Sequence, residues 1–164
     1  MSAIKYLISL GIALVFLLQP VFITADSRFI DNGDGTVTDK KLGLMWAESD
    51  NLGNIDWRQA KKWITYTFLY TIQTRYEDWR LPTLKEIKTL VPKEGLHKGM
   101  ETECGMTVKI IPQIKLTCGW VWTSETKDIS ATVFSFEDGY QFPDLKIHLK
   151  AHRALAVREM RSAQ

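Results

Sequence analysis

A short apolar run near the start of the chain limits what the rest of the sequence can fold into. It extends from Tyr6 to Leu18 and is followed by the small-residue segment 23–25. A membrane-spanning helix needs about 20 apolar residues, whereas the hydrophobic region of a signal peptide needs about 7 to 15 and ends at a small-residue cleavage site. We therefore expect a signal peptide at residues 1–25, with an uncleaved anchor helix as the alternative.

The length and charge of the remaining segment, residues 26–164, indicate one exported domain. This length is enough for one hydrophobic core and leaves little room for a second domain. The whole chain has 21 basic and 19 acidic residues, a net charge of +2. A generally basic nucleic-acid binder is therefore not expected, and any site for a polyanion must be local. We predict a secreted or periplasmic protein with no stable membrane span after cleavage.

Two cysteines, Cys104 and Cys118, lie in the predicted exported part. An even number of cysteines in an oxidising compartment favours a disulfide. The alternative is a redox-active or metal-binding thiol pair, but the C-x-x-C spacing typical of such pairs is absent. We predict a structural disulfide.

Turn and cap residues divide the first half of the domain. The Gly-rich segment 31–35 lies between two β-prone runs and predicts a hairpin; the EF-hand ligand spacing that a calcium loop would need is absent. The apolar run of residues 42–46 predicts a buried strand. Asp56 is a helix cap, and apolar residues at helical spacing follow it from Trp57 to Phe68.

The segment 78–83, with the sequence DWRLPT, predicts the start of a second helix. Pro82 keeps the preceding residue extended, Thr83 can cap the helix, and Glu86 can complete a capping box. The helix is expected from residue 84 to about 91. Arg80 is expected to pair with a carboxylate and to fix this loop, with a substrate contact as the alternative.

The second half of the domain reads as β-structure after a long irregular region. Residues 92–118 show no clear period and hold both cysteines. Three β-like segments follow at 119–124, 131–136 and 140–142. Residues 145–158 alternate strongly between polar and apolar side chains, which predicts a long closing strand.

The order of these motifs resembles the Lcl C-terminal domain family, formerly a domain of unknown function and named from a bacterial collagen-like adhesin. The resemblance covers nearly the whole segment 26–164. It is carried by residues 31–39 (DNGDGTVTD), 43–46 (GLMW), 78–83 (DWRLPT), Glu86, 122–124 (WTS) and the closing 153–158 strand. The motif residues expected to be structural are Trp46, Trp79, Arg80, Pro82, Thr83 and Glu86.

This resemblance implies an α+β fold similar to the C-type lectin and formylglycine-generating-enzyme folds. Such a fold has a small twisted antiparallel sheet, two flanking helices, N- and C-terminal strands that pair, and a long irregular region that carries the ligand surface. Family members are often extracytoplasmic, and the adhesin binds sulfated glycans. The sequence departs from that adhesin in having no collagen-like tract, and the 104–118 insertion is not part of the family's core motif.

The alternation in the last segment suggests a ligand-binding row. On a strand, Lys146, His148, Lys150 and His152 would share one face, with Ile147, Leu149 and Ala151 toward the core. Arg153 could add a bidentate contact to an anionic group. The alternative is a solvated strand face whose lysines prevent edge association. Zinc is not expected, because His148 and His152 would stand about 13 Å apart on a strand.

The aromatic residues divide into two expected groups. Trp46, Trp57 and Trp79 lie at apolar-face positions and are expected in the core. Trp120 and Trp122 lie on one face of a predicted strand beside the irregular region, and they are the candidates for sugar stacking.

The sequence carries no sign of catalysis. No His or cation run beside either cysteine marks an activated thiolate, unlike the copper-dependent cysteine pair of the related formylglycine-generating enzymes. We expect no enzyme activity and no cofactor. The predicted function is an extracytoplasmic, lectin-like binding and adhesion module for an anionic (sulfated or carboxylated) glycan. The alternative is a structural or protein-interaction subunit of a bacterial envelope or surface assembly.

Overall fold

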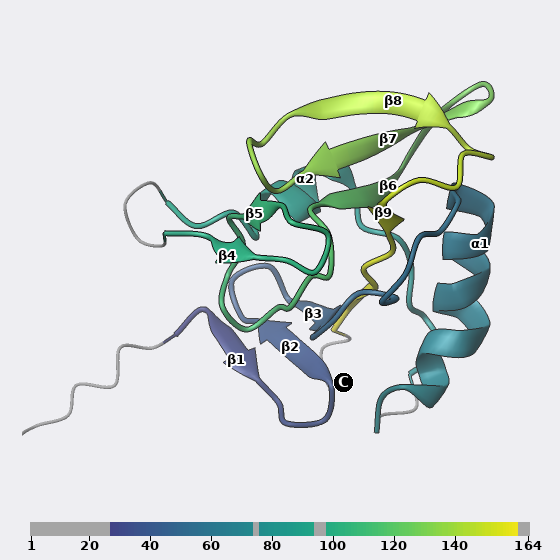
Figure 1. Ribbon diagram of the computed structural model, residues 1–164. Coiled ribbons are helices and arrows are strands. Elements are labelled where there is room, and N and C mark those ends of the chain that lie inside the picture. The colour runs from purple at the N-terminus through teal and green to yellow at the C-terminus, as the bar shows by residue number, and fades with distance from the viewer. Residues whose placement is uncertain (1–26, 74–75, 94–97, 161–164) are drawn as a thin grey trace, which may run out of the picture.

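The computed structural model describes residues 27–73, 76–93 and 98–160. The predicted signal peptide, residues 1–25, lies outside them. The described chain is a mixed α+β domain with two four-stranded sheets, a two-stranded hairpin and short helices (Figure 1). None of the helices described is long and apolar enough to cross a membrane.

The first sheet has the strand order β1-β2-β3-β10, and its neighbouring strands are all antiparallel. Its strands are β1 (Phe29–Asp31), β2 (Thr36–Asp39), β3 (Leu44–Ala47) and β10 (Val157–Glu159). The predicted β1–β2 hairpin is confirmed. Its turn needs Gly33, whose φ of 70° is in the left-handed region that favours glycine.

The pairing of the terminal strands differs from the expectation. β1 and β10 lie at opposite edges of the first sheet, because β10 pairs with β3, where Val157 stands opposite Trp46. The direct pairing of N- and C-terminal strands implied by the resemblance is therefore wrong. β2 and β3 lie between them.

The first helix is confirmed and is longer than its α-helical part. Asp56 caps α1 (Trp57–Lys62) by accepting a hydrogen bond from the Gln59 backbone N–H at 2.8 Å. The chain continues as the π-helix η1 (Trp63–Thr67) and the 3₁₀-helix η2 (Phe68–Tyr70). The buried residues Ala60, Ile64 and Phe68 lie on one side of this continuous rod.

The second helix, α2 (Leu84–Lys88), is shorter than expected but has the predicted capping box. The Thr83 hydroxyl accepts a hydrogen bond from the Glu86 backbone N–H, and the Glu86 carboxylate accepts one from the Thr83 backbone N–H. Pro82 is buried, and its carbonyl accepts a hydrogen bond from the Ser124 backbone N–H at 2.8 Å. The segment before α2 is thus attached to the second sheet.

The irregular region contains one small hairpin, β4 (Met100–Glu101) with β5 (Thr107–Val108). The predicted Cys104–Cys118 disulfide is present, so this hairpin is joined covalently to the residue two positions before β6. Contact there is close: a Cβ on Gly119 would lie 2.9 Å from a methyl carbon of Val108.

The second sheet has the order β8-β7-β6-β9 (Figure 1). Its strands are β6 (Trp120–Lys127), β7 (Ser130–Ser135), β8 (Gln141–Leu145) and β9 (His152–Arg153). β6, β7 and β8 form an antiparallel meander, whereas β9 runs parallel to β6. The expectation of an antiparallel sheet therefore needs one correction, because the short strand β9 is parallel to its neighbour.

The predicted long strand over residues 145–158 is wrong. The chain leaves β8 after Leu145, turns through residues 146–151, and forms only β9 and β10, which belong to different sheets. The apolar side chains expected on the core side are instead exposed, Ile147 by 64% and Leu149 by 61%.

The hydrophobic core includes residues from both large sheets and both α-helices. Trp46 and Trp79 are buried as expected. Trp57 is half-buried, and its indole N–H donates to the Thr123 carbonyl at 2.9 Å, which ties α1 to β6.

Candidate functional site

Three aromatic rings form a surface at one end of the second sheet. Tyr140 immediately precedes β8, Phe142 lies on it, and Trp120 begins β6. The Phe142 ring is stacked with Tyr140 at 6.2 Å and meets Trp120 edge-on at 6.1 Å between centroids. Tyr140 is 64% exposed, and the other two rings are half-buried. We call Trp120, Tyr140 and Phe142 the aromatic surface.

Next to it, one carboxylate gathers three basic side chains. Residue spacing on β8 places Asp144 on the same face as Phe142. Its Oδ1 lies 2.6 Å from His148 Nδ1, and its Oδ2 lies 3.0 Å from Lys150 Nζ and 2.8 Å from His152 Nε2. We call Asp144, His148, Lys150 and His152 the Asp144 cluster.

The Asp144 cluster explains why the predicted cationic row is wrong. To reach one carboxylate, the three basic residues must wrap around it, and a straight strand would spread them along one face. The hydrogen bond from the His148 backbone N–H to the Leu145 carbonyl, 2.9 Å, closes the turn. The 13 Å separation expected between His148 and His152 is wrong for the same reason. Among the residues described, no group of three His, Cys, Asp or Glu is arranged to hold a metal ion.

Burial and hydrogen bonding set the protonation of the cluster. Burial opposes ionisation of Asp144, but the hydrogen bonds from His152, Lys150 and His148 outweigh it and hold the pKa of Asp144 well below its usual range. Burial lowers the pKa of His152 below its ordinary value of 6.5 despite the nearby carboxylate. The His152 Nδ1 is buried with no hydrogen-bond partner. A neutral ring with its proton on Nε2 fits this environment, because protonation would bury an N–H without an acceptor.

Two further candidate residues, Lys146 of the predicted row and Arg153, lie away from the cluster. Lys146 donates from Nζ to the Asp128 carbonyl at 2.7 Å and lies 5.2 Å from the centroid of Trp57. Arg153 is buried and donates to the Thr117 hydroxyl at 2.6 Å. In the same network Thr117 contacts the buried carboxylate of Asp50, whose pKa burial raises. Arg153 is therefore enclosed in a polar network of the interior.

Of the two predicted stacking residues, only Trp120 reaches the surface. Trp122 is fully buried, and its indole N–H donates to the Ile55 carbonyl at 2.9 Å. Its ring meets His152 edge-on at 4.6 Å between centroids. His152 is itself fully buried, so Trp122 and His152 support the surface from below.

Some residues of this site were predicted from the sequence, and others were missed. Trp120, His148, Lys150 and His152 were candidates, whereas Tyr140, Phe142 and Asp144 were not. The missed residues alternate at positions 140, 142 and 144, which on a strand places them on one face. That alternation was the signal available in the sequence.

The predicted structural motif contains an ion pair between Arg80 and Glu86, a residue of α2. Arg80 donates to both oxygens of Glu86, at 2.9 and 2.8 Å, and to Glu159 at 3.3 Å. Burial alone would raise the pKa of Glu86, but Arg80 and Thr83 hold it below its ordinary value. These contacts agree with the structural role expected for Arg80.

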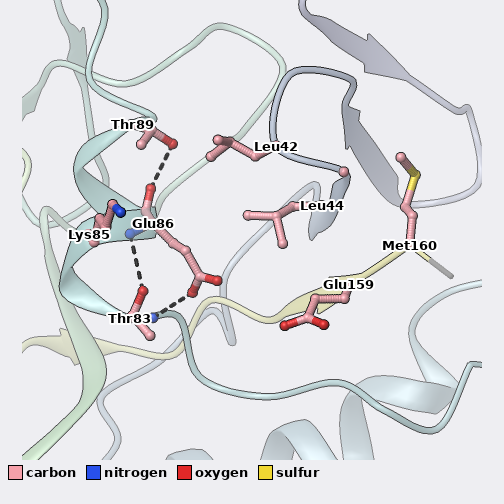
Figure 2. Close-up of a pocket in the computed structure, with 9 residues that line it drawn as sticks. Leu42, Leu44, Thr83, Lys85, Glu86, Thr89, Glu159 and Met160 are labelled. Atoms are coloured by element: carbon pink, nitrogen blue, oxygen red, sulfur yellow. Dashed lines mark hydrogen bonds between the residues drawn. The ribbon is translucent and has the colours of Figure 1, made fainter. Parts of the chain in front are cut away.

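Glu86 and Glu159 also line a pocket of about 490 Å³ between α2 and the first sheet. Figure 2 shows their carboxylates extending toward each other, with Leu44 on an adjoining wall. Arg80 binds both carboxylates, so its single positive charge offsets one of their two negative charges.

The family comparison agrees with the motif order. The model of the Lcl C-terminal domain matches residues 35–158, which include β2 through most of β10 and every residue of the aromatic surface and the Asp144 cluster. No curated protein matches the chain. The chain belongs to the Lcl C-terminal domain family.

Proposed function

We propose that this protein is a non-catalytic, exported binding module that recognises a glycan bearing acidic groups. The single observation that carries the proposal is the aromatic surface with the Asp144 cluster at its border. Aromatic rings offer flat apolar area for the apolar faces of sugar rings, and polar groups beside them can bind hydroxyl groups.

The border of the surface favours an acidic glycan over a neutral one. Lys150 is half-exposed, with 51% of its side chain accessible, and His148 is 37% accessible. Lys150 keeps donor capacity beyond its contact with Asp144, because an ammonium group carries three donors, and the second nitrogen of His148 donates when the ring is protonated. Sulfate or carboxylate groups of a sugar stacked on Tyr140 would meet these donors.

Secretion and a C-type-lectin-like architecture are parts of the same proposal. A disulfide suits an oxidising compartment, in agreement with the predicted signal peptide. The long irregular region packs against the start of β6, from which Trp120 projects, so it lies beside the proposed ligand surface.

A glycan array on residues 26–164, read at two salt concentrations, tests the proposal. We expect sulfated or carboxylated glycans to bind, with affinity that falls as salt rises. Tyr140→Ala and Lys150→Ala should each weaken binding about tenfold, a loss of about 1.4 kcal/mol. The matched controls Tyr70→Ala and Lys41→Ala change exposed residues elsewhere and should bind as the wild type does. Equal effects of test and control variants would contradict the proposal.

A second candidate function is attachment to a protein in an envelope assembly. It is favoured by three exposed aliphatic side chains: Ile129, in the turn between β6 and β7, and Ile147 and Leu149, in the segment that follows β8. The Lys146 backbone N–H donates to the Ile129 carbonyl at 2.9 Å, so these turns are in contact. This function would be favoured if no glycan on the array bound and if a protein partner bound the wild type but not Ile147→Ser.

A further inference from the structure

The helical rod, the 79–81 segment and β6 enclose a second pocket of about 380 Å³. Its lining shares no residue with the aromatic surface or with the Asp144 cluster. It brings together residues from three sequence motifs: the start of α1, the DWRLPT segment and the end of WTS. The proposed glycan surface uses none of these residues.

The floor of this pocket is apolar and largely aromatic. Trp57, Ile64, Trp79 and Leu81 contribute to it. The two indole side chains are fixed: Trp57 donates to the Thr123 carbonyl, and Trp79 packs edge-on against Phe68 with 4.9 Å between centroids. A fixed aromatic floor of this size accommodates a flat ring system without reorganisation.

The rim of the pocket supplies one cation that is not neutralised by the protein. The Lys61 ammonium lies 5.1 Å from the centroid of Trp57, and no carboxylate pairs with it among the described residues. Arg80 also lines the pocket, but Glu86 and Glu159 already bind its terminal nitrogens. No acidic residue is part of the lining, so the electrostatic environment favours an anion.

Two hydroxyl groups on β6 complete the rim. Ser124 and Thr126 both line the pocket, and within the described chain neither hydroxyl makes a hydrogen bond. The β6–β7 register shifts between Trp122 and Thr126, which is the sign of a bulge. Bulges re-aim side chains, and this one lies where β6 borders the pocket.

We propose that this pocket binds a small organic anion with a flat apolar body, such as an aromatic carboxylate or sulfonate. The ring system lies on the Trp57 and Trp79 floor, and the acidic group meets Lys61. Ser124 and Thr126 donate hydrogen bonds to the remaining polar atoms. This site is separate from the proposed glycan surface and does not depend on it.

The probe for the test is 8-anilinonaphthalene-1-sulfonate, an aromatic sulfonate whose fluorescence rises on binding. We expect saturable binding, and tighter binding than that of its uncharged analogue N-phenyl-1-naphthylamine. Lys61→Glu should raise the Kd for the sulfonate at least tenfold. The matched control Lys62→Glu changes the next residue of α1, which is exposed and does not line the pocket, and should change the Kd less than twofold.

Indole N–H signals in a two-dimensional NMR spectrum locate the bound probe. The Trp57 and Trp79 signals should shift on titration, whereas the signal of Trp46, which is fully buried and does not line the pocket, should not. Equal effects of Lys61→Glu and Lys62→Glu, equal affinity of the charged and uncharged probes, or unmoved Trp57 and Trp79 signals would each overturn the proposal. Glycan binding should be the same in Lys61→Glu and wild type, which keeps this test distinct from that of the proposed function.

Discussion

Asp144 organises the end of β8 through one carboxylate. Its two oxygens contact His148, Lys150 and His152, and these contacts turn residues 146–151 away from the sheet. A buried carboxylate with several charged or polar donors is stable, whereas the same carboxylate without them is costly. This residue therefore supports the turn and the border of the aromatic surface together.

The shifted pKa values of His152 and Asp144 predict how the stability of the domain depends on pH. The pKa of His152 is lowered in the folded state, so the unfolded state binds more protons as pH falls through about 6.5, and the free energy of unfolding decreases. The pKa of Asp144 is also lowered, so its contribution is present above about 3.8, its value in the unfolded chain, and is lost progressively as pH falls below that. Urea unfolding at pH 7.5, 6.5 and 5.5 should show a decrease approaching about 1.4 kcal/mol per pH unit.

His152→Gln separates titration from hydrogen bonding. The amide can still donate to Asp144 but takes up no proton, so the slope between pH 7.5 and 5.5 should flatten. His148→Gln is the matched control, because it changes the half-exposed ring on the other carboxylate oxygen and keeps His152. A slope that survives in His152→Gln would show that another group causes it.

The helices of this fold are short and depend on their caps. α2 spans only Leu84–Lys88, yet its first turn carries a complete capping box and the Arg80–Glu86 ion pair. An isolated helix of this length is not stable in water, so these contacts and the burial of Ile87 hold it.

Thr83→Ala should therefore destabilise the domain by about 1 kcal/mol, the usual cost of losing an N-cap hydroxyl. Thermal or urea unfolding measures this change. Thr83→Ser keeps the hydroxyl and is expected to remain near wild-type stability. If the two variants were equally destabilised, the lost methyl packing, and not the cap, would be responsible.

Elements set by local contacts were predictable from the sequence, and those set by distant contacts were not. The β1–β2 hairpin and the Asp56 and Thr83 caps follow from residues a few positions apart. The alternation in 146–152 resembled a strand, but hydrogen bonds to Asp144 outweighed that local preference. The parallel pairing of β9 with β6 depends on where two distant segments meet, which period and propensity do not encode.

At the scale of the molecule, the disulfide joins the irregular region to the second sheet. Cys118 is fully buried and lies two residues before Trp120, while Cys104 lies between β4 and β5. The bridge therefore fixes the β4–β5 hairpin next to the strand that carries part of the aromatic surface.

Removing this bridge should reduce both stability and ligand binding. For a loop of 14 residues, the Cys104→Ala/Cys118→Ala variant should lose about 3 kcal/mol of unfolding free energy. Calorimetry of the variant, with the wild type as reference, tests the first effect, and glycan binding at a temperature where both are folded tests the second. An unchanged melting temperature would show that the hairpin is held by noncovalent packing alone.

The pairing of β10 with β3 also affects when the domain can fold. Val157 pairs with Trp46, so the first sheet is complete only after nearly the whole described chain is available. Contacts between such distant segments form slowly. If the predicted signal peptide directs the chain N-terminus first through a membrane channel, β3 crosses long before its partner strand. In that case the first sheet closes only after the C-terminal strand has reached the other side.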